Sequence, residues 1–79
     1  MWQQKLSNII IDSIRQMRTE RGLSQTEIAY CLVVTKGFIA AVENPKLRAK
    51  YNFNHLNELA KVFNCSFSEF FPTKHFDEK

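Results

Sequence analysis

The 79-residue chain is poor in the residues that hold very small domains together covalently, because it has only two cysteines, Cys31 and Cys65. They form neither a disulfide framework nor the paired-cysteine spacing of zinc sites, so we expect two reduced thiols that pack as small hydrophobic side chains. A zinc site made of both cysteines with His55 and His75 is the alternative, but its intervals match no ligand pattern. We therefore expect no metal and no other cofactor.

The chain also lacks long apolar runs and a leader pattern. It has no stretch of about 18 consecutive apolar residues, and no charged segment followed by an apolar one opens it. We expect an intracellular, cytoplasmic protein with no membrane partner. Glycine occurs only twice, and no glycine-rich phosphate loop is present. The sequence therefore indicates neither an enzyme nor a small-molecule ligand.

What the chain does have is enough apolar material for one core and a small excess of positive charge. Hydrophobic residues make up 44% of the sequence, including seven phenylalanines. We expect a single domain over residues 1–79, with a core of about 7–71, an N-terminal arm 1–6 and a C-terminal tail 72–79. The net charge of +3 and the pI of about 9.1 fit a nucleic-acid partner without excluding others.

Apolar residues recur at helical spacing along most of the chain, and nothing predicts a strand. Five helices are expected, at residues 7–21, 25–32, 36–43, 54–63 and a short one from about 67 to 71. Ser24 and Glu27 have capping-box spacing before the second helix, and Ser66 and Glu69 repeat it before the fifth. Thr35 is a suitable N-cap for the third helix.

Two short helices, 25–32 and 36–43, are patterned to cross closely. The apolar residues that can meet in one core are Ile28, Leu32, Val34, Ile39 and Val42. Ala29 lies where a larger side chain would hold the two helices apart. This pattern is typical of a helix-turn-helix, whose second helix commonly lies in the DNA major groove.

The stretch from Ile14 to Phe71 resembles the XRE/Cro-type helix-turn-helix domains of the lambda-repressor-like family. The resemblance is carried by IRQMRTERGLSQTEIA, TKGFIAAVEN and HLNELAKVFNCSFSEFF, in the family's order and at its spacings. It implies an all-α fold, a compact five-helix lambda-repressor-like domain with the helix-turn-helix at its second and third helices. It also implies a sequence-specific transcription regulator, a small prokaryotic repressor that binds double-stranded DNA as a homodimer at the nucleoid.

The same resemblance implies which residues bind DNA. Ser24 and Gln25 are expected to bind DNA at the start of the second helix, with Gln25 in contact with a backbone phosphate. The positions expected to face base edges are Thr35, Lys36, Gly37, Ala40 and Ala41. The positions expected to hold phosphates are Asn44, Lys46, Arg48 and Lys50. Phe38 either contacts DNA or packs toward the first or second helix.

An ion pair between Arg18 and Glu43 is implied in the same way, with a solvated surface arginine as the alternative. Val33 stands where the family usually has glycine, so either the turn is right-handed here or Val33 is strained at positive φ. The third helix offers few polar side chains for reading bases. A second function therefore stays open, a protein-interaction module of the antitoxin or adaptor kind.

Overall fold

The computed structural model describes residues 2–71 and contains helices and turns, with no strand in that range. Its elements are α1 (Trp2–Glu20), α2 (Gln25–Leu32), α3 (Lys36–Glu43), α4 (Phe53–Phe63) and the 3-10 turn η1 (Phe67–Phe70). The all-α fold class is therefore confirmed for the described residues. The expected count of five helices is wrong, because the fifth is a single 3-10 turn.

The short turn η1 differs from expectation because its predicted capping box does not form. The Ser66 side chain makes no capping bond, and its Oγ lies 2.9 Å from Oγ of Ser68. The Glu69 N–H donates instead to the Ser66 carbonyl at 3.0 Å, which is the i→i+3 pattern of a 3-10 helix. With Pro72 following so closely, the segment has no room to propagate an α-helix.

Helix α1 begins at Trp2, so the expected N-terminal arm 1–6 is instead mostly the first part of this helix. Gln3, Gln4 and Lys5 are good helix formers, and adding residues to an existing helix costs little. The end of α1 is as expected, because Gly22 adopts positive φ (68°) and the Leu23 N–H donates to the Arg18 carbonyl at 3.1 Å.

The predicted caps of α2 and α3 are confirmed. Ser24 and Glu27 form the full capping box, with bonds of 2.7 and 3.0 Å. The Thr35 hydroxyl accepts from the Phe38 N–H at 3.0 Å. Helix α4 also has a cap that sequence analysis missed, in which Asn52 accepts from the His55 N–H and His55 Nδ1 accepts from the Asn52 N–H.

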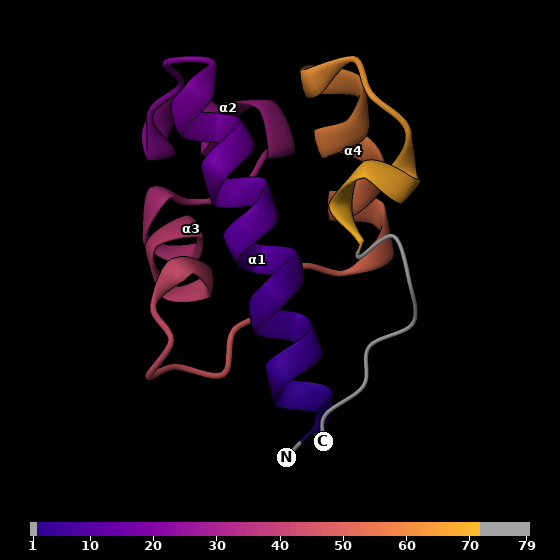
Figure 1. Cartoon of the computed structure of the whole chain (residues 1–79). Helices are drawn as coiled ribbons and strands as arrows, with labels where there is room; N and C mark the ends of the chain where they lie inside the picture. The colour runs from indigo at the N-terminus through magenta and orange to yellow at the C-terminus, as the bar shows by residue number, and fades with distance from the viewer. Residues whose placement is uncertain (1, 72–79) are drawn as a thin grey trace.

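The core lies where the four helices converge. In Figure 1, α1 crosses the molecule with α3 on one side and α4 on the other, and α2 packs against both α3 and α4. The main buried cluster consists of Ile14, Ile28, Ala29, Leu32, Ile39, Leu56, Leu59, Phe63 and Phe70. Burial of each large side chain contributes roughly 1.5–3 kcal/mol. The small side chain of Ala29 lies in this cluster, as the close crossing of α2 and α3 requires.

Three consecutive isoleucines of α1, Ile9 to Ile11, point in different directions and differ in burial. Ile11 is buried, Ile10 packs half-buried against the core, and Ile9 is exposed. Successive residues on a helix point about 100° apart, so one core cannot accept all three.

The two cysteines lie in different environments. Cys31 is exposed on α2, so the expectation that it packs as a hydrophobic side chain is wrong, whereas Cys65 is half-buried against the core. Burial, with Glu69 nearby, raises the pKa of the Cys65 thiol. Among the described residues no group of His, Cys, Asp and Glu could hold a metal ion, and His75 lies outside them.

No single helix in residues 2–71 is long and apolar enough to cross a membrane. The pair of α2 and α3, taken together, has the length and apolar composition of a membrane span, but the two helices are bent by 114° relative to each other.

The turn between α2 and α3 is left-handed at Val33, with φ 57° and ψ 47°. The Val33 N–H donates to the Tyr30 carbonyl at 3.2 Å, and the Val34 N–H donates to that of Ala29 at 3.0 Å. These two bonds form the Schellman motif that ends many helices, and the motif requires positive φ at this position. Of the two alternatives left open by the sequence, the strained turn is therefore the observed one.

We expect Val33→Gly to raise the free energy of unfolding by about 1 kcal/mol. Glycine removes the strain of a β-branched residue at positive φ, and little packing is lost because Val33 is 89% exposed. Asn64→Gly is the matched control, since Asn64 has a similar φ of 53° but asparagine tolerates it better. Urea denaturation of both variants tests this. A smaller gain at Val33 than at Asn64 would contradict it.

Candidate nucleic-acid interface

Helix α3 has one buried face and one open face. Ile39 and Val42 are buried in the protein, whereas Lys36, Gly37 and Ala40 are exposed. Thr35 is also exposed, and its hydroxyl caps the helix. Ala41 is half-buried and lies at the edge of the open face. The residues expected to face bases therefore lie together on one accessible surface.

Phe38 packs inward against the core cluster, to which α1 and α2 contribute Ile14, Ile28 and Leu32. Its ring also meets two aromatic rings that sequence analysis did not foresee, with its centroid 5.2 Å from that of His55 and 6.3 Å from that of Tyr51. These two partners follow α3 in the chain, in the loop and in α4. Phe38 therefore anchors the base of α3, and its half-buried ring is not part of the open face.

Arg18 and Glu43 form the expected ion pair, and it joins the last turn of α1 to the end of α3. The guanidinium donates twice to the carboxylate, from Nε and from Nη2, at 3.0 Å each. Its Nη1 donates to the Leu23 carbonyl at 2.7 Å. The two side chains are only 10% and 5% exposed. This pair fixes the end of α3 relative to the rest of the domain.

Gln25 is part of the same network. Its Nε2 donates to Glu43 Oε1 at 2.9 Å, and the residue is half-buried. Sequence reasoning assigned Gln25 to a phosphate and missed this contact, because the contact depends on how α2 crosses α3. In the described structure the amide N–H₂ group is directed at the protein, while Ser24 beside it is exposed and occupied as the helix cap.

The segment between α3 and α4 is an irregular basic loop. Asn44 Oδ1 accepts from the Lys46 N–H at 2.9 Å, which shapes the turn that follows α3. Lys46 and Arg48 are exposed, and Lys50 is half-buried with its Nζ 3.5 Å from the Arg48 carbonyl. Asn44 therefore has a structural role in positioning these cations.

Tyr51 attaches this loop to the core. Its ring contacts those of Phe38 and His55, and its hydroxyl is buried with no hydrogen-bond partner among the described residues. Burial, and then the charge of Glu43, raises the pKa of Tyr51, so the phenol is neutral at all physiological pH values. The basic loop thus has a fixed point next to α3.

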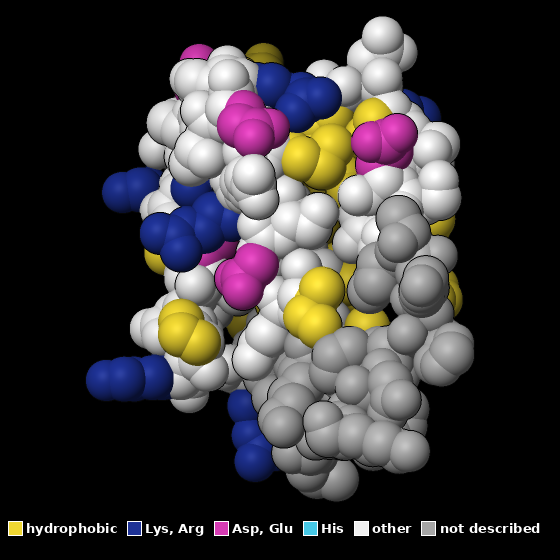
Figure 2. Space-filling view, in the orientation of Figure 1, with side chains coloured by type: hydrophobic (Ala, Val, Ile, Leu, Met, Phe, Trp, Pro, Cys, Tyr) yellow, Lys and Arg dark blue, Asp and Glu magenta, His cyan; other side chains and the backbone are white. Residues whose placement is uncertain are grey.

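The charge of the segment that contains α3 and the following loop is almost entirely positive. Between residues 28 and 57 the sequence has four cations, Lys36, Lys46, Arg48 and Lys50, and one acidic residue, Glu43. That single carboxylate is neutralised by Arg18. Figure 2 shows Lys and Arg side chains projecting along the edge where α3 and the following loop lie. An exposed helix flanked by cations is the surface that a duplex requires.

The comparison with protein families agrees with this geometry, because residues 13–74 match the model of the Cro/C1-type HTH DNA-binding domain. The chain belongs to the Cro/C1-type helix-turn-helix family. The match covers most of the chain and includes every element from α2 to η1. Neither the curated proteins nor the solved structures gave a match.

As a Cro/C1-type domain, the chain is of the DNA-binding class, and α2 and α3 are its helix-turn-helix. The open face of α3 and the basic loop are the features of this particular chain that lie where such a domain would present them.

Proposed function

We propose that the chain is a sequence-specific transcription regulator, a small repressor, that places α3 (Lys36–Glu43) in the DNA major groove. The observation that carries this proposal is the division of α3 into a buried face and an exposed face bordered by cations. The proposal places the protein in the cytoplasm at the nucleoid. It assigns base contacts to Thr35, Lys36 and Ala40, with Lys36 donating to guanine O6 or N7.

Gly37 supports close approach of another molecule to α3. A glycine within a helix costs roughly 0.5–1 kcal/mol relative to alanine. The protein itself does not need it, since an added Cβ would meet nothing closer than Thr35 Oγ1 at 3.8 Å. Because Gly37 has no side chain, a sugar-phosphate backbone or a base edge could approach the exposed face of α3 more closely there.

The phosphate contacts follow from the cations and the helix ends. The N-terminus of α3, at Lys36, presents free N–H groups to an anion, and Lys46, Arg48 and Lys50 follow in the adjacent loop. Gln25 is still proposed to contact a phosphate, because it lies at the start of α2, although its Nε2 donates a hydrogen bond to Glu43. We expect about four phosphate contacts per protomer.

One protomer has few polar side chains with which to discriminate bases. Ala40 and Gly37 have no hydrogen-bonding side chain, which leaves Lys36 and Thr35. We therefore propose a homodimer that reads two half-sites about 34 Å apart, with sequence-dependent DNA shape supplying further selectivity.

A protein-interaction module is the second candidate function. It is favoured by two exposed apolar side chains at the end of α2, Tyr30 and Val33, beside the start of α3. A partner protein that binds there would cover the same end of the helix-turn-helix that we assign to DNA.

A salt titration with a non-specific duplex separates the two candidates. For about four neutralised phosphates, the logarithm of the affinity should fall with the logarithm of salt concentration at a slope near −3.6. Fluorescence anisotropy at several salt concentrations gives this slope directly. Absence of binding at low salt would contradict DNA binding and favour the interaction module.

A further inference from the structure

The turn between α2 and α3 carries an apolar side chain that the fold does not require. Val33 has a φ of 57°, where a β-branched residue is strained, and it is 89% exposed. The crossing of the two helices needs the left-handed backbone at this position, and glycine supplies that backbone without strain. The valine side chain therefore adds strain and contributes little burial. Strained residues that the fold does not explain cluster at functional sites.

Val33 lies beside a second exposed side chain with a large apolar part. Tyr30, in the last turn of α2, is 86% exposed and lines an open hollow together with Val33 and Thr35. We call Tyr30 and Val33 the turn patch. Thr35 is the N-cap of α3 and is assigned above to a base contact, and the exposed Lys36 follows it directly. The turn patch is thus continuous with the proposed DNA surface.

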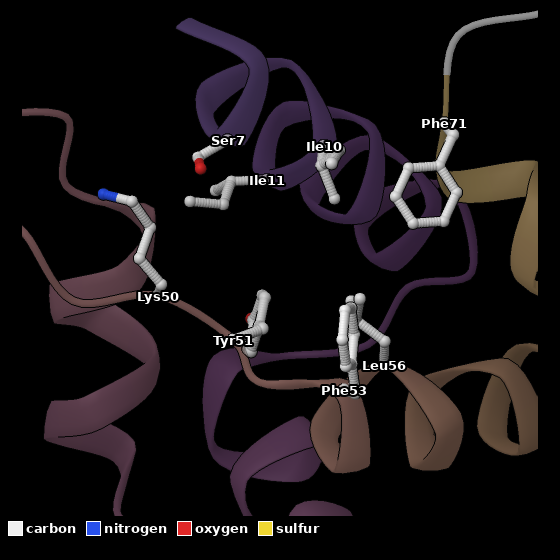
Figure 3. A pocket seen from close by; sticks show the side chains of 8 residues that line it. All are labelled: Ser7, Ile10, Ile11, Lys50, Tyr51, Phe53, Leu56 and Phe71. Atoms are coloured by element: carbon white, nitrogen blue, oxygen red, sulfur yellow. The ribbon is translucent and has the colours of Figure 1, made fainter. Parts of the chain in front are cut away.

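The turn patch is small and separate from the other exposed apolar side chains. Phe53, for example, is 78% exposed, but it lines a cavity with Ile10 and Leu56 (Figure 3). Among the described residues, no other large exposed apolar side chain lines the hollow beside the turn patch. A stable protein–protein interface buries roughly 800 Å² on each partner, from about 20–30 residues. Two side chains therefore suit a contact within a DNA surface better than a protein interface of their own.

We propose that the turn patch contacts DNA, with the Val33 methyl groups against the C5-methyl of a thymine and the Tyr30 hydroxyl donating to a nearby phosphate oxygen. The thymine methyl projects into the major groove, where apolar side chains can read it. This inference rests on the function proposed above, in which Thr35 and Lys36 contact bases in that groove. It gives a base contact to a domain whose α3 has few polar side chains for reading bases. The strain at Val33 is then a loss of stability that is retained because it favours binding.

Two substitutions at Val33 separate affinity from stability. Val33→Gly and Val33→Asn both relieve the strain, so neither should lower the free energy of unfolding. Each should nevertheless weaken binding to a duplex of alternating dA and dT about fourfold, the factor for one methyl group that stays in water. Fluorescence anisotropy measures this affinity. Asn64→Gly is the matched control, because Asn64 also has positive φ but lies at the end of α4, and its affinity should be unchanged.

The thymine methyl is tested by removing it from the DNA. A duplex with deoxyuridine in place of thymidine should bind the unaltered protein about fourfold more weakly. Val33→Gly should bind the two duplexes equally, because the contact with the methyl group is already lost. Any effect of deoxyuridine on the shape of the duplex is common to both proteins. The difference between them therefore isolates the contact of Val33 with the thymine methyl.

The phosphate contact is tested with Tyr30→Phe, which keeps the exposed ring and removes the hydroxyl. The affinity should fall about fivefold, the factor for one hydrogen bond. The dependence on salt should stay the same, because a hydroxyl contact releases no counterion. Unaltered affinity would remove Tyr30 from the DNA surface, and a shallower salt dependence would show that the substitution displaces a cation instead.

Unchanged affinity in both Val33 variants, or equal losses for the unaltered protein and Val33→Gly on the deoxyuridine duplex, would overturn the proposal. If Lys36→Ala combined with Arg48→Ala still weakened binding in the same assay, the function proposed above would stand, and the turn patch would be left to a partner protein. If the unaltered protein bound no duplex even at low salt, the proposed function and the turn-patch contact would both fail.

Discussion

Arg18→Met should lower the free energy of unfolding by about 3–5 kcal/mol, the largest effect we expect from a single substitution outside the apolar core. The substitution keeps an unbranched side chain of similar length, so little packing is lost. Among the described residues, it leaves the Glu43 carboxylate, 5% exposed, with the bond from Gln25 alone. The Leu23 carbonyl loses its donor as well.

The matched control is the exposed pair of Lys61 and Glu58 on α4. Their atoms lie 3.2 Å apart, but the side chains are 66% and 46% exposed. Lys61→Met should therefore cost no more than about 0.5 kcal/mol. Urea denaturation of both variants gives the comparison, and equal losses would show that burial of the Arg18 pair has no energetic consequence.

A double variant shows where the loss comes from. Arg18→Met combined with Glu43→Leu removes both charges, so no unpaired carboxylate remains in the protein interior. Because buried pairs contribute little net free energy, the double variant should recover much of the stability lost in Arg18→Met. A double variant that is less stable than Arg18→Met would mean that the pair itself stabilises the fold.

The sequence predicted the helix-turn-helix well because local signals mark it. Ser24 and Thr35 are residue types that commonly cap helices, and their hydroxyls accept the capping bonds of α2 and α3. In each of these helices the apolar residues recur every three to four positions and are buried. The start of α1 has no such mark, since Gln3 and Gln4 are helix formers that specify no boundary. The first helix was consequently placed five residues too late.

The contacts that sequence reasoning missed all depend on how helices cross. Gln25 carries nothing in its sequence neighbourhood that chooses between a phosphate and Glu43, and the choice follows from the packing of α2 on α3. Phe38 likewise finds Tyr51 and His55 only because the loop after α3 returns across that helix. The asparagine cap of α4 was the exception, because the order Asn52 to His55 is a local signal that could have been read.

The strained turn at Val33 shows a local preference overruled by a larger requirement. A β-branched residue disfavours positive φ, yet the α2–α3 crossing buries Leu32 and Ile39 only if the chain reverses within the turn. The gain from that burial exceeds the strain of one residue. The sequence alone indicated the conflict between the strain of Val33 and the burial of its neighbours, but it could not determine which of the two free energies is larger.

On the function side, Lys36→Ala combined with Arg48→Ala should weaken DNA binding at least tenfold while leaving the fold intact. Both residues are exposed, so we expect a change in the free energy of unfolding within about 0.5 kcal/mol. Lys36 is also the first residue of α3, where a positive charge opposes the helix dipole, so its removal does not weaken the helix. The salt dependence should become shallower by about 1.8, the contribution of two phosphates.

The matched control changes the net charge equally on two other helices of the molecule. Arg15→Ala with Lys61→Ala also removes two exposed cations, one on α1 and one on α4, and takes the protein from +3 to the same net charge. Anisotropy titrations of both double variants at the same salt concentrations, beside thermal unfolding of each, make the comparison. If attraction to DNA came only from total charge, the two double variants would lose equal affinity and equal slope. A selective loss at Lys36 and Arg48 is what an interface built on α3 and its following loop requires.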